Sequence, residues 1–241
     1  MGTKAKLKYQ RVKDLVVKSI LDGEIADQEC LPSERELCQR YHASRVTIRK
    51  AVDELEQEGV LYRIQGKGTF LKHQQKVTQP LTRLTGFTED MHAQGKVAGS
   101  RILLMERTAA NAMLAEKLHL QPGEEIIVFR RLRLADGEPM AIETTYLDYQ
   151  RFSPMLEEFT AGESFYAFMR NRLGIVPKHA LQSMEVAPLA SWEAELLGNG
   201  KLDVAMLMYR QTFDQDERPI EYVISKYRSD KYKFKIDLYT L

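Results

Sequence analysis

Arg45, Thr47, Arg49 and Lys50 follow Ser44 within six residues of the chain. Arginine can pair both acceptor atoms of a guanine base at once, and such a contact discriminates between bases by roughly 1–3 kcal/mol. A threonine hydroxyl and the free amides of a helix start suit the oxygens of a phosphate. Together these side chains favour a surface that reads DNA, although a single arginine more often belongs to a solvated helix face.

A hairpin with a cationic tip follows this cluster. Residues 60–64 and 68–71 have the pattern of two short strands, and Gln65, Gly66 and Lys67 form the loop between them. A lysine at such a tip can reach a backbone phosphate or the minor groove. On these residues alone, an ordinary surface turn is the alternative.

A second set of charged residues lies in the C-terminal half. Arg131 and Arg133 are two positions apart on a predicted strand, so their side chains project from the same face. Two guanidiniums repel each other unless an anion lies between them, and a phosphate or a carboxylate is the natural partner. A solvated face with acidic residues on the neighbouring strand explains the pair equally well.

Three further residues are candidates for the same site. Glu143 and Glu221 each lie in an otherwise apolar predicted strand, where a buried carboxylate needs a donor. A sugar hydroxyl meets that need, and so does a salt bridge to Arg131 or Arg133. Ser164 begins a predicted helix, where its hydroxyl and the adjacent amides can hold an anion or simply cap the helix.

A helix-turn-helix is needed to position the N-terminal cluster. Residues 9–21 and 33–41 show the helical spacing of apolar side chains, and Ser33 with Glu36 forms a capping box. Ser44 begins a third helix, whose first turns would enter the major groove. The apolar stripe of this helix follows the i, i+3, i+4, i+7 pattern and comprises Ile48, Ala51, Val52 and Leu55.

The second half of the chain has a different pattern. Residues 73–81 are polar, lack periodicity and contain Pro80, which predicts an interdomain linker. Beyond it, hairpin-linked strands are interspersed with helices. The predicted strands are residues 100–108, 125–135, 139–146, 179–186, 205–213, 219–226 and 234–239. This pattern indicates an α+β domain around an antiparallel sheet, in a chain of two domains.

Composition narrows the class of protein. The 241 residues are 44% hydrophobic, which suits one large or two ordinary domains, and the net charge is +1. Residues 1–72 carry 14 Lys and Arg against 11 Asp and Glu, an excess too small to establish a nucleic-acid partner by itself. The two cysteines, the lack of a long apolar run and the lack of a signal-peptide core predict a soluble cytoplasmic protein without a membrane partner.

The stretch from residue 31 to residue 71 resembles the winged-helix domain of the GntR regulators. The segments PSER, SRVTIRKAVDELEQEG and RIQGKGTF carry this resemblance. It implies that residues 1–72 form a domain that binds double-stranded operator DNA. The residues assigned to DNA binding are Arg35, Ser44, Arg45, Thr47, Arg49, Lys50, Gln65, Gly66, Lys67, Gly68 and Thr69.

Residues 82–241 resemble the UTRA domain, the ligand-binding domain of the HutC branch of these regulators. The segments LTGFTEDM, FRRLRLADGEPMAIETTYL and RPIEYVISKYRSDKYKF carry this resemblance, and the implied fold is that of chorismate lyase. The sequence looks close to the subgroup that senses phosphorylated amino sugars, although Gly86 stands where those relatives usually have serine.

The resemblance to that subgroup also assigns roles in effector binding. Phe87 and Thr88 are expected to line the mouth of the pocket. The residues expected to hold the phosphate are Arg131, Arg133, Ser164 and Tyr166. The residues expected to bond the sugar are Glu143, Glu221 and Tyr227.

The function that the resemblance implies is transcriptional regulation. The expected protein is a repressor released from its operator by a sugar phosphate, with a carboxylate metabolite as the second candidate effector. A homodimer is expected because one winged helix reads only half a site. No metal or cofactor is expected, since the five histidines lack metal-ligand spacing. The alternatives are a chorismate-lyase-like enzyme fused to a DNA-binding head and an architectural DNA-binding protein.

Overall fold

The computed structural model describes residues 2–25, 30–71, 76–198, 202–238 and 240, with residues 2–7 and 21 placed by their backbone alone. The chain forms two compact units, residues 1–75 and 76–241, each with its own core. None of the helices in the described ranges combines the length and the apolar character that crossing a bilayer requires.

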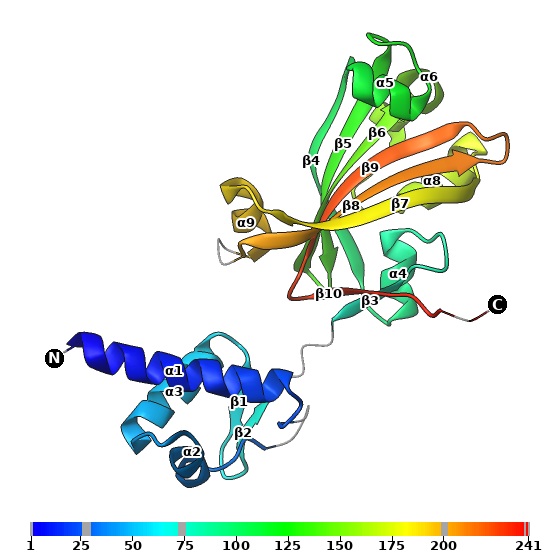
Figure 1. The fold of residues 1–241 in the computed structure, drawn as a ribbon. Coiled ribbons are helices and arrows are strands. Elements are labelled where there is room, and N and C mark those ends of the chain that lie inside the picture. Colours follow the sequence, from blue (N-terminus) through cyan, green and yellow to red (C-terminus); the bar gives the residue numbers. More distant parts are fainter. Residues whose placement is uncertain (1, 26–29, 72–75, 199–201, 239, 241) are drawn as a thin grey trace. The chain divides into compact units, whose positions relative to one another are not determined.

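Three helices and a hairpin make up the N-terminal unit (Figure 1). The helices α1 (Gly2–Leu21) and α2 (Glu34–Tyr41) both pack against α3 (Arg45–Gln57), and β1 (Leu61–Ile64) pairs antiparallel with β2 (Gly68–Leu71). The core of this unit includes Val12, Val16, Leu37, Ile48, Ala51, Val52, Leu55, Leu61 and Leu71. The predicted apolar stripe of α3 is therefore buried, and the predicted helix-turn-helix with its hairpin is confirmed.

Local hydrogen bonds fix the ends of α2 and α3. The Ser33 amide donates to Glu36 Oε2 (2.8 Å) and the Glu36 amide donates to Ser33 Oγ (3.4 Å), which is the predicted capping box. At the start of α3 the Thr47 amide donates to Ser44 Oγ (3.3 Å). His42 ends α2 in the left-handed conformation with φ 49°. These contacts set the tight turn that presents the first residues of α3.

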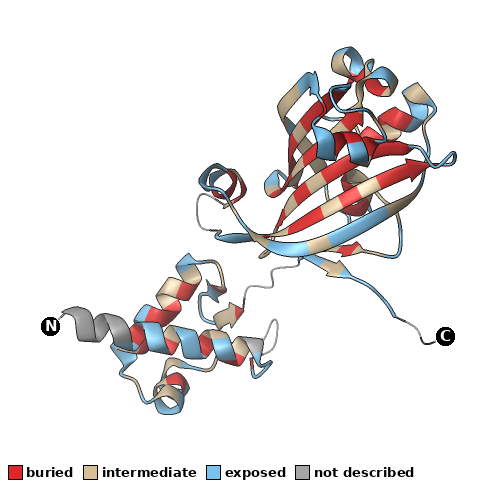
Figure 2. Ribbon diagram, turned by 45° about the horizontal axis from the view of Figure 1, so that its top comes forward, coloured by how far each residue is buried: buried red, intermediate tan, exposed pale blue. Residues whose placement is uncertain are grey.

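A six-stranded antiparallel sheet forms the centre of the C-terminal unit (Figure 1). The strand order is β4 (Ala98–Ala109), β5 (Glu125–Ala135), β6 (Glu138–Asp148), β9 (Pro219–Arg228), β8 (Val204–Asp214) and β7 (Pro177–Pro188). In the sheet register Arg131 lies opposite Glu143, and Thr212 lies opposite Glu221. Buried residues dominate β5, β6, β8 and β9, whereas the edge strand β7 is largely exposed (Figure 2).

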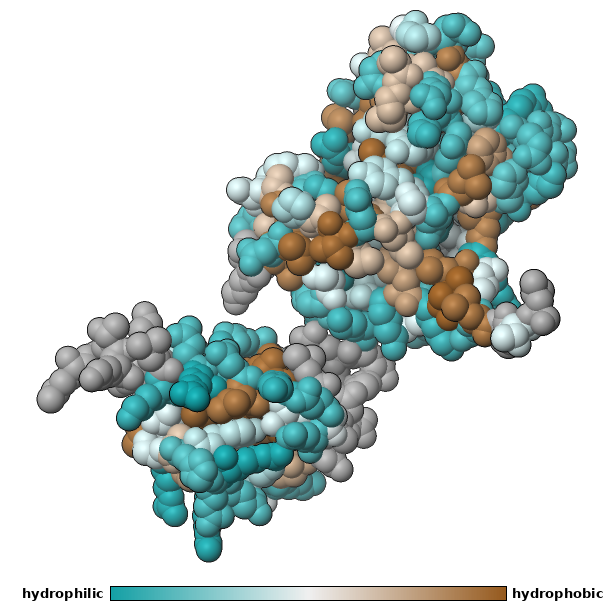
Figure 3. Space-filling model, viewed as in Figure 1, coloured by the Kyte–Doolittle hydropathy of each residue, from teal (hydrophilic) through white to brown (hydrophobic). Residues whose placement is uncertain are grey.

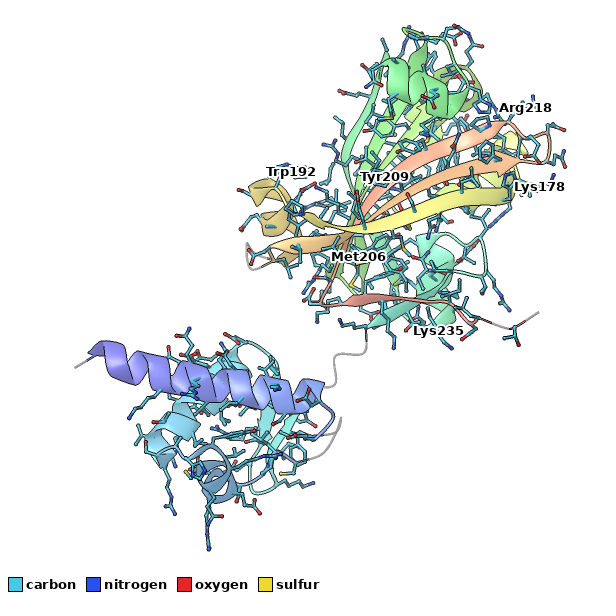
Figure 4. The ribbon with its side chains drawn as sticks, viewed as in Figure 1. Lys178, Trp192, Met206, Tyr209, Arg218 and Lys235 are labelled. Carbon is cyan, nitrogen blue, oxygen red and sulfur yellow. The ribbon has the colours of Figure 1, made fainter. Side chains whose placement is uncertain are left out.

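Helices cover both faces of this sheet. Phe129 of β5 packs with the short helices α6 (Tyr149–Phe152), α7 (Met155–Glu158) and α8 (Phe165–Phe168), which a π-helical turn follows at Met169–Leu173. Its neighbour Val128 projects to the opposite face, because successive strand residues alternate, and packs with α5 (Ala112–Leu118). Arg131 and Arg133 share the face of Phe129. Trp192 marks α9 (Ser191–Gly198) at one end of the sheet, and Lys178 and Arg218 mark the other end (Figure 4).

The strands predicted from residue 100 to residue 226 are all present, with ends shifted by two residues at most. The predicted fold class, a winged helix-turn-helix followed by an α+β domain around an antiparallel sheet, is therefore confirmed. The last predicted strand, residues 234–239, is displaced: the chain forms β10 at Tyr232–Lys235, and residue 239 lies outside the described residues.

The predicted linker, residues 73–81, needs a correction at its C-terminal end. Residues 77–80 form β3 (Val77–Pro80), which pairs in parallel with β10 and belongs to the second unit. Val77 and Gln79 are buried on this strand because they face α4 (Phe87–Ala93) and the sheet. A strand of four residues is too short for its alternation to stand out from a polar segment. Residues 73–75 lie outside the described residues.

Candidate functional site

A small cavity of about 30 Å³ lies in the C-terminal unit, between the sheet and the first residues of α4 and α8. The nine residues that the sequence assigned to effector binding all line it, although they come from five separate elements. They are Phe87, Thr88, Arg131, Arg133, Glu143, Ser164, Tyr166, Glu221 and Tyr227. The sequence did not assign the remaining lining residues, Gln79, Gly86, Phe165, Met208, Arg210 and Val223.

Arg131 and Arg133 form a buried cationic pair on β5, with exposures of 3% and 4%. Arg133 donates to Ser100 Oγ (2.7 Å) and to Thr88 Oγ1 (3.2 Å), and its guanidinium lies 4.6 Å from the centroid of the Phe87 ring. Burial, reinforced by the charge of Arg131, lowers the pKa of Arg133 to about 10. Among the described residues, Arg131 Nε, Arg131 Nη1 and Arg133 Nε have no hydrogen-bond partner.

Glu143 lies opposite Arg131 in the sheet register and forms an ion pair with it. Burial raises the pKa of this carboxyl, but the charges of Arg131 and Arg133 outweigh burial and hold the pKa below its ordinary value. The salt bridge that the sequence left open as an alternative is therefore formed. It uses one terminal nitrogen of Arg131, and the guanidinium also lies 4.4 Å from the centroid of the Phe129 ring and 5.8 Å from that of Phe165.

Glu221 is held by two hydroxyl groups. Tyr166 Oη and Thr212 Oγ1 both donate to Glu221 Oε1, at 2.7 Å and 2.9 Å. Burial raises the pKa of Glu221, and the hydrogen bond from Tyr166 offsets this effect only in part. Burial and the neighbouring Glu221 charge also raise the pKa of Tyr166, so this phenol is a neutral donor. Tyr227 lines the same wall, and burial raises its pKa in the same way.

Ser164 caps α8 with its side chain, since the Ala167 amide donates to Ser164 Oγ (3.3 Å). This contact is the helix-cap alternative that the sequence left open. The residue also lines the cavity, as do Phe87 and Thr88 at the first turn of α4. The residue that caps α8 is therefore also part of the cavity lining.

Arg210 is a third buried cation at this site, and the sequence analysis did not single it out. It donates to Gln182 Oε1 (2.8 Å) and to the Thr85 carbonyl (3.2 Å), so it connects β8 with β7 and with the loop before α4. A charged residue within an otherwise apolar strand was the signal that identified Glu143 and Glu221, and the same signal was present at Arg210. No sequence signal pointed to Gln79, because its burial depends on the pairing of β3 with β10.

The residues assigned to DNA binding lie on three parts of the N-terminal unit. Exposed side chains occur at the start of α2, at the start of α3 and at the hairpin tip: Arg35, Ser44, Arg45, Arg49, Lys50, Gln65 and Lys67. Thr47 is half-buried, and its hydroxyl lies 2.9 Å from Ser44 Oγ. Gly66 and Gly68 at the turn have φ of 74° and 124°, which suits glycine, and Thr69 is half-buried beside them.

The cations of α3 differ in their contacts. Arg49 forms a bidentate ion pair with Glu34 of α2 (3.0 and 2.9 Å), and Lys50 Nζ lies 4.2 Å from the centroid of the Tyr9 ring. Arg45 forms no ion pair with any residue in the described ranges. In the folded unit, Arg45 is thus available to a nucleic acid directly, whereas Arg49 must share or exchange its carboxylate partner.

Comparison with known families agrees with both halves of this architecture. Residues 8–71 match the family model of bacterial regulatory proteins of the gntR family, and residues 93–233 match the UTRA domain. The second match alone covers more than half of the chain. The helix-turn-helix, the hairpin and the cavity described above fall within these two matched regions, apart from the segment of β3 and the start of α4.

Similar proteins match along nearly the whole chain. The HTH-type transcriptional repressor NagR of Bacillus subtilis is 34% identical over 94% of this chain and 92% of its own length. A probable fructoselysine utilization operon transcriptional repressor of Escherichia coli is 31% identical, over 89% of this chain and 87% of its own length. The crystal structure of PhnF from Mycobacterium smegmatis covers 95% of this chain and all of its own, with 30% identity and a TM-score of 0.67.

These relatives are regulators of transcription and not enzymes. The protein is accordingly a DNA-binding transcriptional regulator that belongs to the GntR family, in the branch that carries a UTRA domain.

Proposed function

We propose that the protein is a homodimeric repressor that leaves its operator when a sugar phosphate binds the cavity of the C-terminal unit. An amino-sugar 6-phosphate is the leading candidate. The observation that carries this proposal is the buried pair Arg131 and Arg133, whose two guanidiniums have three nitrogen atoms without a hydrogen-bond partner among the described residues. A buried donor without a hydrogen-bond partner costs free energy, so the site favours a ligand that is rich in hydrogen-bond acceptors.

The arrangement of donors favours a phosphate over a carboxylate. A phosphate group has three terminal oxygens, which can accept from both guanidiniums together with the hydroxyls of Thr88 and Ser164. A carboxylate has two oxygens and one negative charge, and Glu143 already supplies a carboxylate to Arg131. A carboxylate metabolite remains the second candidate effector. Titrations with sugar phosphates and with organic acids, described below, distinguish the two.

The neighbouring strands β6 and β9 suit the hydroxyl and amino groups of a sugar. Glu143 and Glu221 present carboxylate oxygens to the cavity, and Tyr227 lines the same wall. Carboxylates accept hydrogen bonds from hydroxyls and ammonium groups, and these bonds are strong where water is excluded. The Escherichia coli relative is named for fructoselysine utilization, which supports a sugar-derived effector for this chain.

The size of the cavity supports a change of conformation on binding. A volume of about 30 Å³ is far below the roughly 300–1,000 Å³ of typical small-molecule sites. The first turns of α4 and α8, which carry Phe87 and Ser164, would have to shift. This movement is the proposed origin of the change in operator affinity.

The exposed edge of the sheet supports a dimer formed through the C-terminal units. On β7, Leu181 and Val186 are 62% and 65% exposed, and Trp192 of α9 is 46% exposed. Apolar atoms gather near α9 on the surface of this unit (Figure 3). An edge strand with exposed apolar side chains is a ready interface for a second copy. Two linked winged helices would then bind the two halves of an operator in the bacterial cytoplasm.

A two-way titration tests the proposal. An operator duplex is first selected from a random-sequence pool with the purified full-length protein. Fluorescence anisotropy then gives operator affinity with and without glucosamine 6-phosphate, and calorimetry gives affinity for the sugar phosphate with and without operator. Linkage requires the two affinities to fall by the same factor. The proposal would be contradicted if the full-length protein bound no sugar phosphate and no organic acid.

A further inference from the structure

Gln79 is the only lining residue of the cavity that belongs to β3. Its side chain is 2% exposed, and its Oε1 has no hydrogen-bond partner in the described part of the chain. A buried acceptor without a partner is uncommon in folded proteins, and one that faces a cavity points to a donor supplied from outside the chain.

The strand that carries Gln79 is tied to the mouth of the cavity. Gln94, which follows α4, accepts from the Thr78 amide (2.9 Å) and donates to the Asp90 carbonyl (2.9 Å). Val77 packs in one cluster with Phe87 and Met91 of α4. A shift of α4 on ligand binding would therefore move β3 with it.

The same strand is the first element of the C-terminal unit in chain order. The sequence places five residues between Leu71, the end of β2, and Val77, the start of β3. A displacement of β3 therefore acts on the chain that leads to the DNA-binding unit. No other residue that lines the cavity is so close to that connection along the sequence.

We infer that Gln79 accepts a hydrogen bond from a hydroxyl or amino group of the effector and thereby transmits occupancy of the cavity to the winged helix. This inference rests on the proposed function and assigns a role to one residue within it. An effector that lacks a donor at this position leaves the buried carboxamide unsatisfied, so Gln79 also discriminates between ligands that share a phosphate.

The test uses three variants of the full-length protein. Gln79→Met keeps the length of the side chain and removes its polar atoms. Gln79→Ala, which only removes atoms, is measured in the same way in case the methionine variant does not fold. Thr78→Val is the matched control, because adjacent strand residues project to opposite faces and Thr78 does not line the cavity.

Two quantities are measured for each variant with glucosamine 6-phosphate as the probe. Calorimetry gives its dissociation constant, and anisotropy gives the ratio of operator affinities without the probe and at saturating probe. We expect Gln79→Met to weaken probe binding by about tenfold or more and to bring the operator ratio close to one. Inorganic phosphate, which engages the arginines alone, should bind both proteins equally, and Thr78→Val should retain the parental values.

Each outcome decides the inference. An unchanged dissociation constant in Gln79→Met, or an unchanged operator ratio, would overturn it while the proposed function stands. A parental protein that binds no sugar phosphate would instead overturn the proposed function, and the role of Gln79 with it. If Gln79 had a purely structural role, Gln79→Met would lower the melting temperature of the ligand-free protein. It would also weaken the binding of phosphate and of glucosamine 6-phosphate together.

Discussion

Arg131 and Arg133 line the same cavity from adjacent positions on one face of β5, yet in the described ranges only Arg131 has a carboxylate partner. Glu143 lies directly opposite Arg131, whereas Arg133 has the neutral hydroxyls of Ser100 and Thr88. The lowered pKa of Arg133 reflects burial and the charge of Arg131. Three arginines and two glutamates line the cavity, so its own residues carry one more positive than negative charge when both carboxyls are ionised.

Replacement of Arg133 should affect sugar-phosphate binding and the stability of the fold in opposite directions. We expect Arg133→Met to abolish the increase in melting temperature that glucosamine 6-phosphate produces, because half of the anion site is lost. Without ligand, the free energy of unfolding should rise by about 1 kcal/mol or more, because a desolvated and uncompensated charge is replaced by an apolar side chain. Differential scanning fluorimetry and urea unfolding measure the two effects.

The matched control for this prediction is Arg130→Met. Arg130 immediately precedes Arg131 on β5 and projects to the opposite face, where its guanidinium is 5.5 Å from the Trp192 ring centroid. That variant should keep the response to ligand. Loss of stability in Arg133→Met would show instead that the guanidinium holds the fold together through Ser100 and Thr88.

Local patterns predicted the N-terminal unit well. The capping residues Ser33 and Ser44 and the apolar stripe of α3 depend on neighbours within one or two turns, and all are confirmed. The ion pair of Arg49 with Glu34 could not be foreseen, because it joins two helices whose crossing is set by the whole core. Helical periodicity shows which face is exposed, but not which exposed charges meet.

Strand periodicity gave only part of the cavity. It placed Arg131 and Arg133 on one face, but it could not bring Glu221 to them, because that requires the long-range pairing of β6 with β9. The resemblance to a family supplied the missing residues. Neither strand periodicity nor the family resemblance identified Gln79. Its burial depends on pairing with Phe234, which lies far along the chain.

The two carboxyls of the cavity should respond to pH in opposite directions. Glu143 has a lowered pKa, so its ionised form stabilises the fold above the ordinary value of 4.5, and this contribution disappears as pH falls through the lower folded value. Glu221 has a raised pKa, so its protonated form is favoured in the fold, and stability is lost as pH rises from 4.5 through the higher folded value.

Glutamine substitutions make this difference measurable. Glu143→Gln should be most destabilising near neutral pH, by about 3 kcal/mol or more, because it leaves Arg131 buried without its partner. This penalty should shrink below pH 4.5. Glu221→Gln mimics the protonated acid, so its stability relative to the parent should be higher at neutral pH than at pH 4.5. Urea unfolding across this pH range measures the stability of each variant relative to the parent. The assignment would be contradicted if both relative stabilities changed in the same direction with pH.

Arg45 and Lys67 should affect DNA binding in different ways. Arg45 lies exposed at the start of α3 and should contact bases, so Arg45→Ala should reduce the preference for the selected operator over random duplex by roughly 1–3 kcal/mol. Lys67 lies exposed in the hairpin turn and should contact phosphate. Lys67→Ala should weaken binding to both duplexes alike and flatten the salt dependence by about one unit of slope.

Anisotropy titrations at several salt concentrations distinguish these roles. Lys178→Ala is a suitable control, because this exposed lysine is paired with Glu217 in the C-terminal unit and should not alter either quantity. Operator binding by Arg45→Ala with parental preference would refute its role in base recognition. A loss of preference in Lys67→Ala would show that the hairpin reads sequence as well.

Gly86 offers a gain of function in the cavity. A Cβ at this position would lie 3.5 Å from Tyr166 Cδ2, an ordinary van der Waals contact, and the backbone has φ −87° and ψ 160°, which any residue adopts. Gly86→Ser therefore fits without strain and adds a hydroxyl to the lining of the cavity. We expect this variant to bind glucosamine 6-phosphate several-fold more tightly, because the new donor adds a hydrogen bond to an acceptor-rich ligand.

The same hydroxyl has a competing use, which sharpens this last prediction. Gly86 is the cap residue of α4, and a serine hydroxyl there can accept a hydrogen bond from a backbone amide of the first turn. This hydrogen bond should raise the free energy of unfolding by a few tenths of a kcal/mol. Gly162→Ser is the matched control, because a Cβ there meets open space and Gly162 does not line the cavity. If Gly86→Ser stabilises the ligand-free protein but leaves the calorimetric affinity at the parental value, the hydroxyl caps the helix and does not reach the ligand.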